Sequence, residues 1–202
     1  IEYGAQRIAW GLAKKLILAD RAYVFSKAVF ADLNTYSGMY VIVALLTFSI
    51  YEYCDFSGGI VVVIGVSELF GIRLDENFRQ PYFSTSLGDF WRRWHITLSG
   101  WFRDYIYIPL GGNRKGQARQ LFNMFLVWAA TGIWHGASWN FIAWGLYYFV
   151  LLTIEKTFLL KYLKKGKVWP HLYTLFFVVL GWGLFTANQP GAPLGLLMQK
   201  LF

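Results

Sequence analysis

Five apolar runs constrain the possible fold of this chain most, because each is shorter than a helix that crosses a bilayer. They cover residues 39–53, 60–72, 121–134, 141–154 and 172–186. A helix that rises 1.5 Å per residue needs about 20 residues to cross about 30 Å of hydrocarbon. A helix that spans the bilayer must therefore extend beyond each run into the flanking aromatic and small polar residues. We expect re-entrant or broken helices among them.

The composition supports a membrane protein. Of 202 residues, 56% are hydrophobic and 15% are charged, against about 25% charged residues in an ordinary soluble domain. The net charge of +8 suits either nucleic acid or an anionic membrane face. Because the basic residues alternate with membrane-seeking aromatic residues, we expect membrane lipids as partners and no nucleic acid. The lone Cys54 excludes an intramolecular disulfide and offers no metal cluster.

We expect an all-α integral membrane domain over residues 1–202, as a piece of a longer chain. Residues 1–38 carry charges among apolar residues and read as interfacial helices. The expected order then continues with a span plus a broken or re-entrant helix at 39–72, an interfacial region at 73–120, a helical hairpin at 121–160 and a further span at 168–188. Gly58 and Gly59 are the expected break in the second region.

Basic residues flank the expected hairpin on both sides. They are Arg114, Lys115 and Arg119 before it, and Lys161, Lys164, Lys165 and Lys167 after it. A hairpin would place both clusters at one end, which the positive-inside tendency assigns to the cytoplasmic side.

The stretch FWRRWHITLSGWFRDYIYIPLGGNRKG, residues 90–116, predicts an amphipathic helix that begins at Ser86. One face carries Trp91, Trp94, Leu98, Trp101, Phe102 and Tyr105. Arg92, Arg93 and Arg103 lie on the opposite face. Such a helix lies at the headgroup boundary, with tryptophans toward lipid and arginines toward water or phosphate. Anchoring alone would account for the arginines.

Two histidines stand out as candidate functional groups. His95 falls at the edge of the aromatic face, next to Ser99 and Arg92. His135 lies in IWHGASWNF, the expected hairpin turn, with Asn140 as a candidate hydrogen-bond partner. A core histidine bonded to a carbonyl is an equally good interpretation of His135 from position alone. Asp55, beside the expected helix break, would line a cavity or be satisfied by neighbouring groups.

Read together, these motifs resemble the membrane-bound O-acyltransferase superfamily. DFWRRWHITLSGWFRDYIYIPLGGNRKG and GIWHGASWNF carry the resemblance, which covers about residues 51–154. CDFSG and NFRQPY fit the branch that serves bacterial cell-envelope polysaccharides such as alginate. The resemblance implies a multi-span helical fold around a central channel, with His135 as the catalytic histidine and His95 as a second essential one. After CDFSG the chain departs from the family pattern, which usually continues with a tyrosine and an aspartate, because residues 59–62 here are Gly-Ile-Val-Val.

The resulting functional hypothesis is O-acetylation of an exported polysaccharide in the bacterial cytoplasmic membrane. We expect an acetyl-CoA or other acyl-thioester donor, no tightly bound cofactor and no metal. The expected partners are the exported polysaccharide and periplasmic acetyl-transfer proteins. We expect Trp134, Asn140, Ser99, Arg92 and Asp55 to line the substrate channel.

Two alternatives remain at this point. One is transfer of D-alanine to teichoic acid by a relative with the same type of histidine. The other is a transporter or structural membrane subunit, in which the histidines relay protons or pack.

Overall fold

The structure, a computed structural model, describes residues 2–136, 138–187 and 194–201, and every regular element in those ranges is helical. The chain forms two compact units, one of residues 1–77 and 186–202 and the other of residues 78–185. Among the described residues, three helices are long and apolar enough to cross a membrane, namely Met39–Leu69, Trp139–Leu163 and Trp169–Thr186. The expected all-α membrane fold is therefore confirmed.

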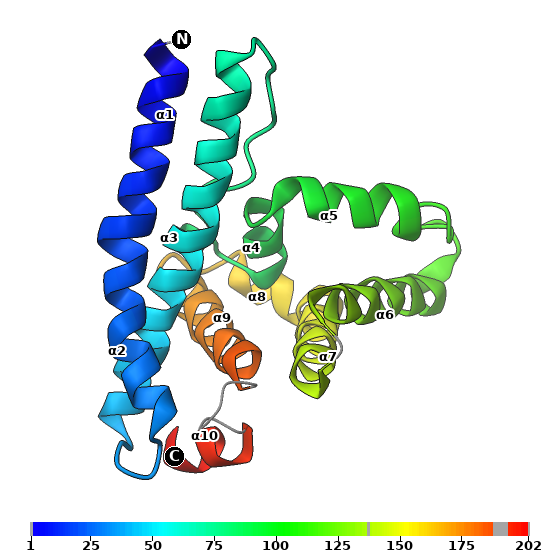
Figure 1. The fold of residues 1–202 in the computed structure, drawn as a ribbon. Coiled ribbons are helices and arrows are strands. Elements are labelled where there is room, and N and C mark those ends of the chain that lie inside the picture. Colours follow the sequence, from blue (N-terminus) through cyan, green and yellow to red (C-terminus); the bar gives the residue numbers. More distant parts are fainter. Residues whose placement is uncertain (1, 137, 188–193, 202) are drawn as a thin grey trace. The chain divides into compact units, whose positions relative to one another are not determined.

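In the first unit, an N-terminal helical rod packs along a single long helix (Figure 1). The rod consists of α1 (Glu2–Ala13), the π-helical segment η1 (Lys14–Ala19) and α2 (Asp20–Ala31), and the long helix is α3 (Met39–Leu69). A short helix, α10 (Leu194–Leu201), joins this unit, and the backbone N–H of Gly38 donates to the Lys200 carbonyl at 2.9 Å. The predicted interfacial position of residues 1–38 stays a prediction, but their packing partner is α3.

Glycines allow the rod and α3 to approach closely. A Cβ atom added to Gly58 would lie 2.9 Å from the Gly11 carbonyl oxygen, and one added to Gly11 would lie 2.6 Å from that of Gly58. Gly4 and Gly65 make the same reciprocal contact at 2.7 Å. The predicted break at Gly58 and Gly59 is wrong, because α3 continues through both residues. A helix tolerates such glycines when backbone packing offsets their cost of about 1 kcal/mol each.

The second unit contains the expected hairpin. Its elements are η2 (Pro81–Phe83), α4 (Leu87–Arg93), α5 (Ile96–Phe102), η3 (Arg103–Tyr107), α6 (Gly116–His135), α7 (Trp139–Ile154), η4 (Glu155–Leu159), α8 (Leu160–Leu163) and α9 (Trp169–Thr186). Helices α6 and α7 are the hairpin arms, and α9 is the further helix expected at 168–188; residue 188 lies outside the described residues.

Glycines also bring the hairpin arms together. A Cβ atom at Gly132 would lie 2.6 Å from the Phe141 carbonyl oxygen, and one at Gly145 would lie 2.4 Å from that of Trp128. The hairpin fixes where the α6 C-terminus, and thus His135, can lie.

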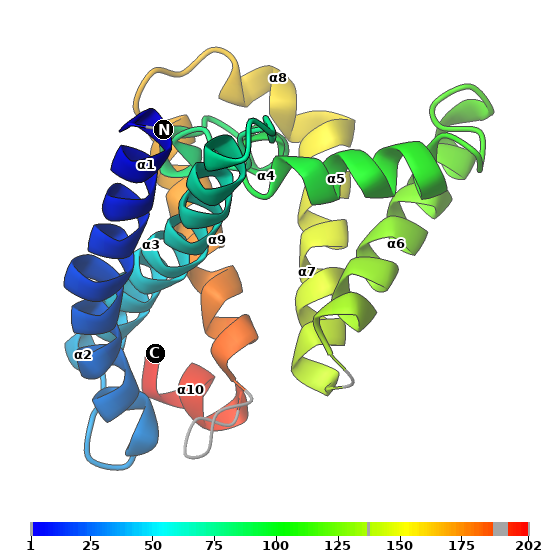
Figure 2. The ribbon, with the colours of Figure 1, turned by 45° about the horizontal axis from the view of Figure 1, so that its top comes forward.

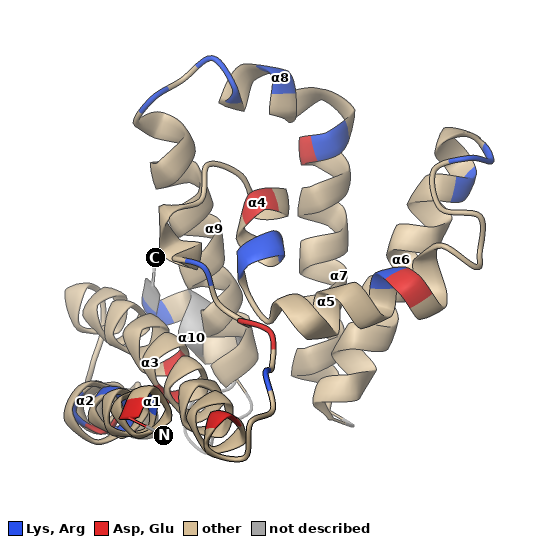
Figure 3. Cartoon of the chain, turned by 90° about the horizontal axis from the view of Figure 1, so that it is seen from above, with Lys and Arg blue, Asp and Glu red and all other residues tan. Residues whose placement is uncertain are grey.

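The two basic clusters lie at the same end of this hairpin. In Figure 2 the start of α6 and the η4–α8 segment both lie at the upper end of the hairpin, and Figure 3 shows lysines and arginines on both. The Lys156 Nζ atom lies 4.0 Å from the Met124 Sδ atom, so η4 contacts α6 at this end of the hairpin. The predicted common end is confirmed, whereas its assignment to the cytoplasmic side stays a prediction.

Candidate active site

The predicted amphipathic helix is two helices, broken at His95. It begins as expected, because the Ser86 Oγ atom accepts a hydrogen bond from the Asp89 N–H at 3.0 Å. However, α4 ends at Arg93, Trp94 is extended, and His95 adopts a left-handed conformation with φ 45° and ψ 59°. The chain becomes helical again at Ile96. The continuous helix predicted from Ser86 is wrong at this point.

Long-range contacts explain the break. The Arg79 N–H donates to the Arg93 carbonyl at 3.0 Å, and Phe78 forms an isolated antiparallel bridge with Trp94. The rings of Phe78 and Trp94 meet edge to face, with centroids 5.0 Å apart. The NFRQPY segment thus pairs with the RRWH segment. This pairing occupies backbone groups that a continuous helix would have used.

The break also divides the aromatic face. Trp94 is buried and stacks against Phe90, with ring centroids 5.5 Å apart, whereas Trp101 and Tyr105 remain exposed. Trp91 is half-buried and packs on Trp128, Trp144 and Tyr148. The expectation that these tryptophans all face lipid is therefore wrong for Trp91 and Trp94, which belong to the protein interior.

His135 ends α6 within a group of aromatic rings. Its imidazole centroid lies 5.0 Å from that of Trp144, 5.1 Å from Phe185 and 6.0 Å from Phe141. Gly136 ends the helix with φ 149°, a value that favours glycine. The rings hold the half-buried imidazole from several sides.

Trp134 connects the two histidines. Its ring centroid lies 4.9 Å from that of His135 and 6.3 Å from that of His95. The Trp134 side chain is 56% exposed, so it presents a surface beside both imidazoles. The structure thus brings together three of the residues predicted from sequence.

Burial sets the protonation of both histidines, which lie outside the three candidate spans. Loss of solvation lowers the pKa of His95 to about 4. It lowers the pKa of His135 to about 4 as well, and the nearby His95 imidazole adds to this effect. Both groups are therefore neutral near pH 7, which is the form that can accept a proton.

Asn140 and Ser99 support the backbone around this pair. The buried Asn140 side chain donates from Nδ2 to the Phe185 carbonyl at 2.9 Å, which ties α7 to α9. The Ser99 Oγ atom donates to the Trp91 carbonyl at 3.2 Å, and the Ser99 N–H donates to the His95 carbonyl at 3.1 Å. These bonds are structural, and the predicted channel-lining role of both residues stays a prediction.

Arg92 and Asp55 lie elsewhere. The exposed Arg92 projects from α4 toward Asp89, at an Nη2–Oδ1 distance of 3.7 Å. Asp55 belongs to the first unit, where its carboxylate forms an ion pair with the Lys15 Nζ atom at 2.6 Å. The predicted channel-lining role of both residues stays a prediction.

Two supporting residues were missed from sequence. Trp144 is 1% exposed and packs against His135, but it is one aromatic residue among many in an apolar helix. Glu155 is buried, and its carboxylate accepts the backbone N–H groups of Leu87 at 2.7 Å and Gly88 at 2.9 Å, which fixes α4 on η4. A carboxylate at the end of an apolar run was the only available signal. Within the described ranges, no group of three or more histidine, cysteine or acidic side chains could hold a metal ion.

The second unit is thus a helical membrane structure with a paired-histidine site among aromatic rings. The chain belongs to the MBOAT, or membrane-bound O-acyltransferase, family. Its residues 15–190 match the sequence model of that family.

Curated relatives agree with this assignment. The chain is 41% identical to the "probable alginate O-acetylase AlgI" of Pseudomonas fluorescens, over 92% of this chain and 38% of the relative. It is 37% identical to the "peptidoglycan O-acetyltransferase" of Helicobacter pylori, over 93% of this chain and 36% of the relative. It is 34% identical to the "teichoic acid D-alanyltransferase" of Bacillus subtilis, over 70% of this chain and 40% of the relative. The chain therefore spans about two-fifths of the length of these relatives.

Proposed function

We propose that this chain carries the histidine site of an enzyme that transfers an acetyl group to a hydroxyl of an exported cell-envelope polysaccharide. One observation carries the proposal: the imidazoles of His95 and His135, far apart in sequence, both lie beside the Trp134 ring. Burial lowers the pKa of each histidine to about 4, which favours the neutral form near pH 7. The names of the alginate and peptidoglycan O-acetylating relatives agree with an acetyl group and a polysaccharide acceptor.

In the proposed reaction, His135 is the general base. Its imidazole takes the proton from the acceptor hydroxyl as the oxygen attacks the carbonyl carbon of an acyl thioester. A carbon–oxygen bond forms, the carbon–sulfur bond breaks, and the departing thiolate receives the proton from the His135 imidazolium. Atoms and charge balance without a metal or an oxidant.

His95 has a separate role in this proposal. The His95 ring centroid lies 6.3 Å from that of Trp134. The left-handed backbone of His95 fixes the direction in which its side chain leaves the chain. It would orient the acceptor hydroxyl by a hydrogen bond toward His135. The exposed Trp134 ring would supply an apolar surface against which a sugar ring can stack.

The remaining parts of the proposal concern the whole protein. The donor is acetyl-CoA or another acyl thioester, and no cofactor is tightly bound. The acceptor is the exported polysaccharide or a periplasmic protein that passes the acetyl group on. The site of action is the bacterial cytoplasmic membrane, where membrane lipids surround the protein.

Transfer of D-alanine to teichoic acid is the second candidate. The similarity to the Bacillus subtilis D-alanyltransferase favours it, but at lower identity and over less of this chain than the acetylating relatives. Analysis of the envelope polymer for ester-linked acetate and ester-linked D-alanine separates the two functions.

The test uses the purified full-length protein, a radiolabelled acetyl thioester and the polysaccharide acceptor. His135→Ala should lower transfer about 10² to 10⁴-fold, the usual contribution of a positioned general base. His171→Ala, which removes the third histidine of the chain, is the matched control and should retain transfer. Equal transfer by all three proteins would reject the proposed function.

A further inference from the structure

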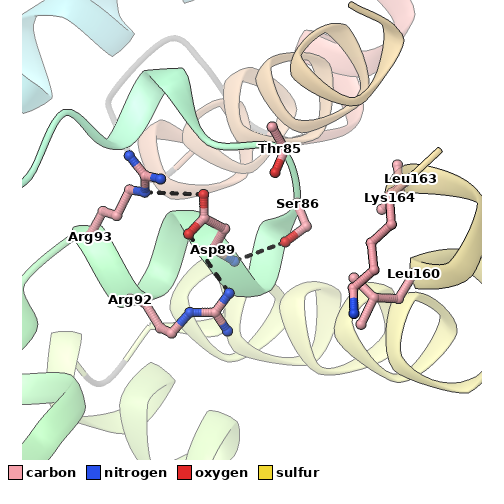
Figure 4. A pocket seen from close by; sticks show the side chains of 8 residues that line it. All are labelled: Thr85, Ser86, Asp89, Arg92, Arg93, Leu160, Leu163 and Lys164. Atoms are coloured by element: carbon pink, nitrogen blue, oxygen red, sulfur yellow. Dashed lines mark hydrogen bonds and ion pairs between the residues drawn. The ribbon is translucent and has the colours of Figure 1, made fainter. Parts of the chain in front are cut away.

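A cavity of about 450 Å³ lies between α4 and α8, away from the residues that surround His135. Figure 4 shows the side chains that line it, with Lys164 on the wall opposite Ser86 and Arg92. The lining residues are Thr85, Ser86, Asp89, Arg92, Arg93, Leu160, Leu163 and Lys164. None of the residues given a role in the proposed transfer reaction lines this cavity.

The cavity has an excess of positive charge. Three of its lining side chains are cations, and Asp89 is the only carboxylate among them. Asp89 is shared, because its Oδ2 atom lies 3.0 Å from the Arg93 Nε atom and its Oδ1 atom lies 3.7 Å from Arg92. The nearby Glu155 carboxylate is engaged by two backbone N–H groups. One carboxylate shared by two guanidinium groups leaves the site favourable for an anion.

The depth of the cavity indicates which anion it meets. Lys164 directly follows the candidate span Trp139–Leu163, a position at which lipid headgroups are expected if this helix crosses the bilayer. Leu160 and Leu163 form an apolar wall beside Lys164. A site that combines cations with aliphatic side chains matches a phosphate that carries an apolar or extended substituent.

We propose that this cavity binds a phosphate ester, with Lys164 and Arg92 as its principal cationic contacts. The shared chemistry is a phosphate group, supplied either by the headgroup of an anionic phospholipid or by the phosphates of a soluble thioester donor. The donor source rests on the proposed function, whereas the lipid source does not. Arg93, which is paired with Asp89, contributes further positive charge to the lining.

The experiment compares two substitutions that remove the same charge from neighbouring positions. Lys164→Gln changes a lining residue, and Lys165→Gln changes an exposed residue outside the lining. The full-length protein is placed in phosphatidylcholine nanodiscs that either lack phosphatidylglycerol or contain about 20 mol% of it, since anionic headgroups attract basic residues near the membrane surface. Retention of phosphatidylglycerol is measured by native mass spectrometry, and binding of CoA is measured by calorimetry in discs without anionic lipid.

Lys164→Gln should weaken one of the two ligands about tenfold, the expected effect of one lost charge-assisted hydrogen bond. Lys165→Gln should change both by less than about twofold. Selective loss of phosphatidylglycerol assigns the lipid source, and selective loss of CoA assigns the donor source. Equal effects of the two substitutions, or no effect of either, would overturn the phosphate site.

The binding readouts are independent of catalysis. Full-length protein with His135→Ala should keep the phosphate ligand, since His135 does not line the cavity. A failure of the acetyl-transfer proposal therefore leaves the lipid arm of this test intact.

Discussion

The imidazole of His135 packs edge to face against the indole of Trp144, with ring centroids 5.0 Å apart and an interplanar angle of 82°. His135 ends α6 and Trp144 lies within α7, so the contact fixes the imidazole relative to the opposite arm of the hairpin. The close glycine contacts between the arms set the spacing that this contact requires.

Trp144 should therefore act as a positioning residue. Trp144→Ala opens a cavity beside His135 and should lower acetyl transfer per folded protein about 100-fold, the scale expected from a 1 Å misplacement. Trp144→Phe retains an aromatic edge and should stay within about threefold of the original rate. The measurement is the initial rate normalised to folded protein in the membrane fraction. A normal rate for Trp144→Ala would show that the contact does not position His135.

Substitutions of His95 should separate its backbone role from its side-chain role. Asparagine tolerates a left-handed conformation better than alanine, so His95→Asn should unfold near the original temperature, whereas His95→Ala should lose about 1 kcal/mol. Both should lose most acetyl transfer, because neither carries an imidazole. Thermal unfolding in detergent and the transfer rate are measured on the same preparations. Equal stability of the two variants would argue against backbone strain at this position.

The pH dependence of the acetyl-transfer rate should reflect a histidine base with a lowered pKa. Burial lowers the pKa of His135 to about 4, so its neutral form persists well below the ordinary histidine pKa of about 6.5. Transfer at pH 5.5 should therefore remain within about twofold of that at pH 7, whereas an ordinary histidine base would lose about tenfold. Initial rates between pH 5 and 8 test this. A half-maximal rate near pH 6.5 would contradict the buried, neutral base.

Two adjacent glycines of α3 provide a matched stability test. A Cβ atom at Gly58 would meet the Gly11 carbonyl oxygen at 2.9 Å, whereas one at Gly59 would meet no atom within 4 Å. Gly58→Ala should force the rod away from α3 and lower the unfolding temperature. Gly59→Ala should preserve or raise the unfolding temperature, because alanine favours the helix by up to about 1 kcal/mol of free energy relative to glycine. Thermal unfolding of the full-length protein in detergent distinguishes them, and equal shifts would contradict the close glycine contact.

The sequence predicted the helical membrane fold and the hairpin, and it singled out the two histidines that the structure brings to Trp134. These features depend on long apolar runs, on glycines at the turn and on motifs that resemble a known family. The start of α4 was also predictable, because a serine followed three residues later by aspartate is a local capping signal.

The errors arose where distant segments meet. The break at His95 depends on Phe78 and Arg79 pairing with the end of α4, and the unbroken α3 depends on Gly11 lying against Gly58. Helical periodicity reports neither contact, because it considers one segment at a time. Trp144 was missed for the same reason, since only the folded hairpin distinguishes it from the other aromatic residues.

The most direct test of the account is the acetyl content of the exported polysaccharide in cells whose full-length gene carries His135→Ala, with membrane abundance of the protein measured in parallel. The account predicts loss of nearly all ester-linked acetate at normal abundance. Unchanged acetate at normal abundance would contradict it and would make His135 a packing residue, in favour of a transporter or structural subunit.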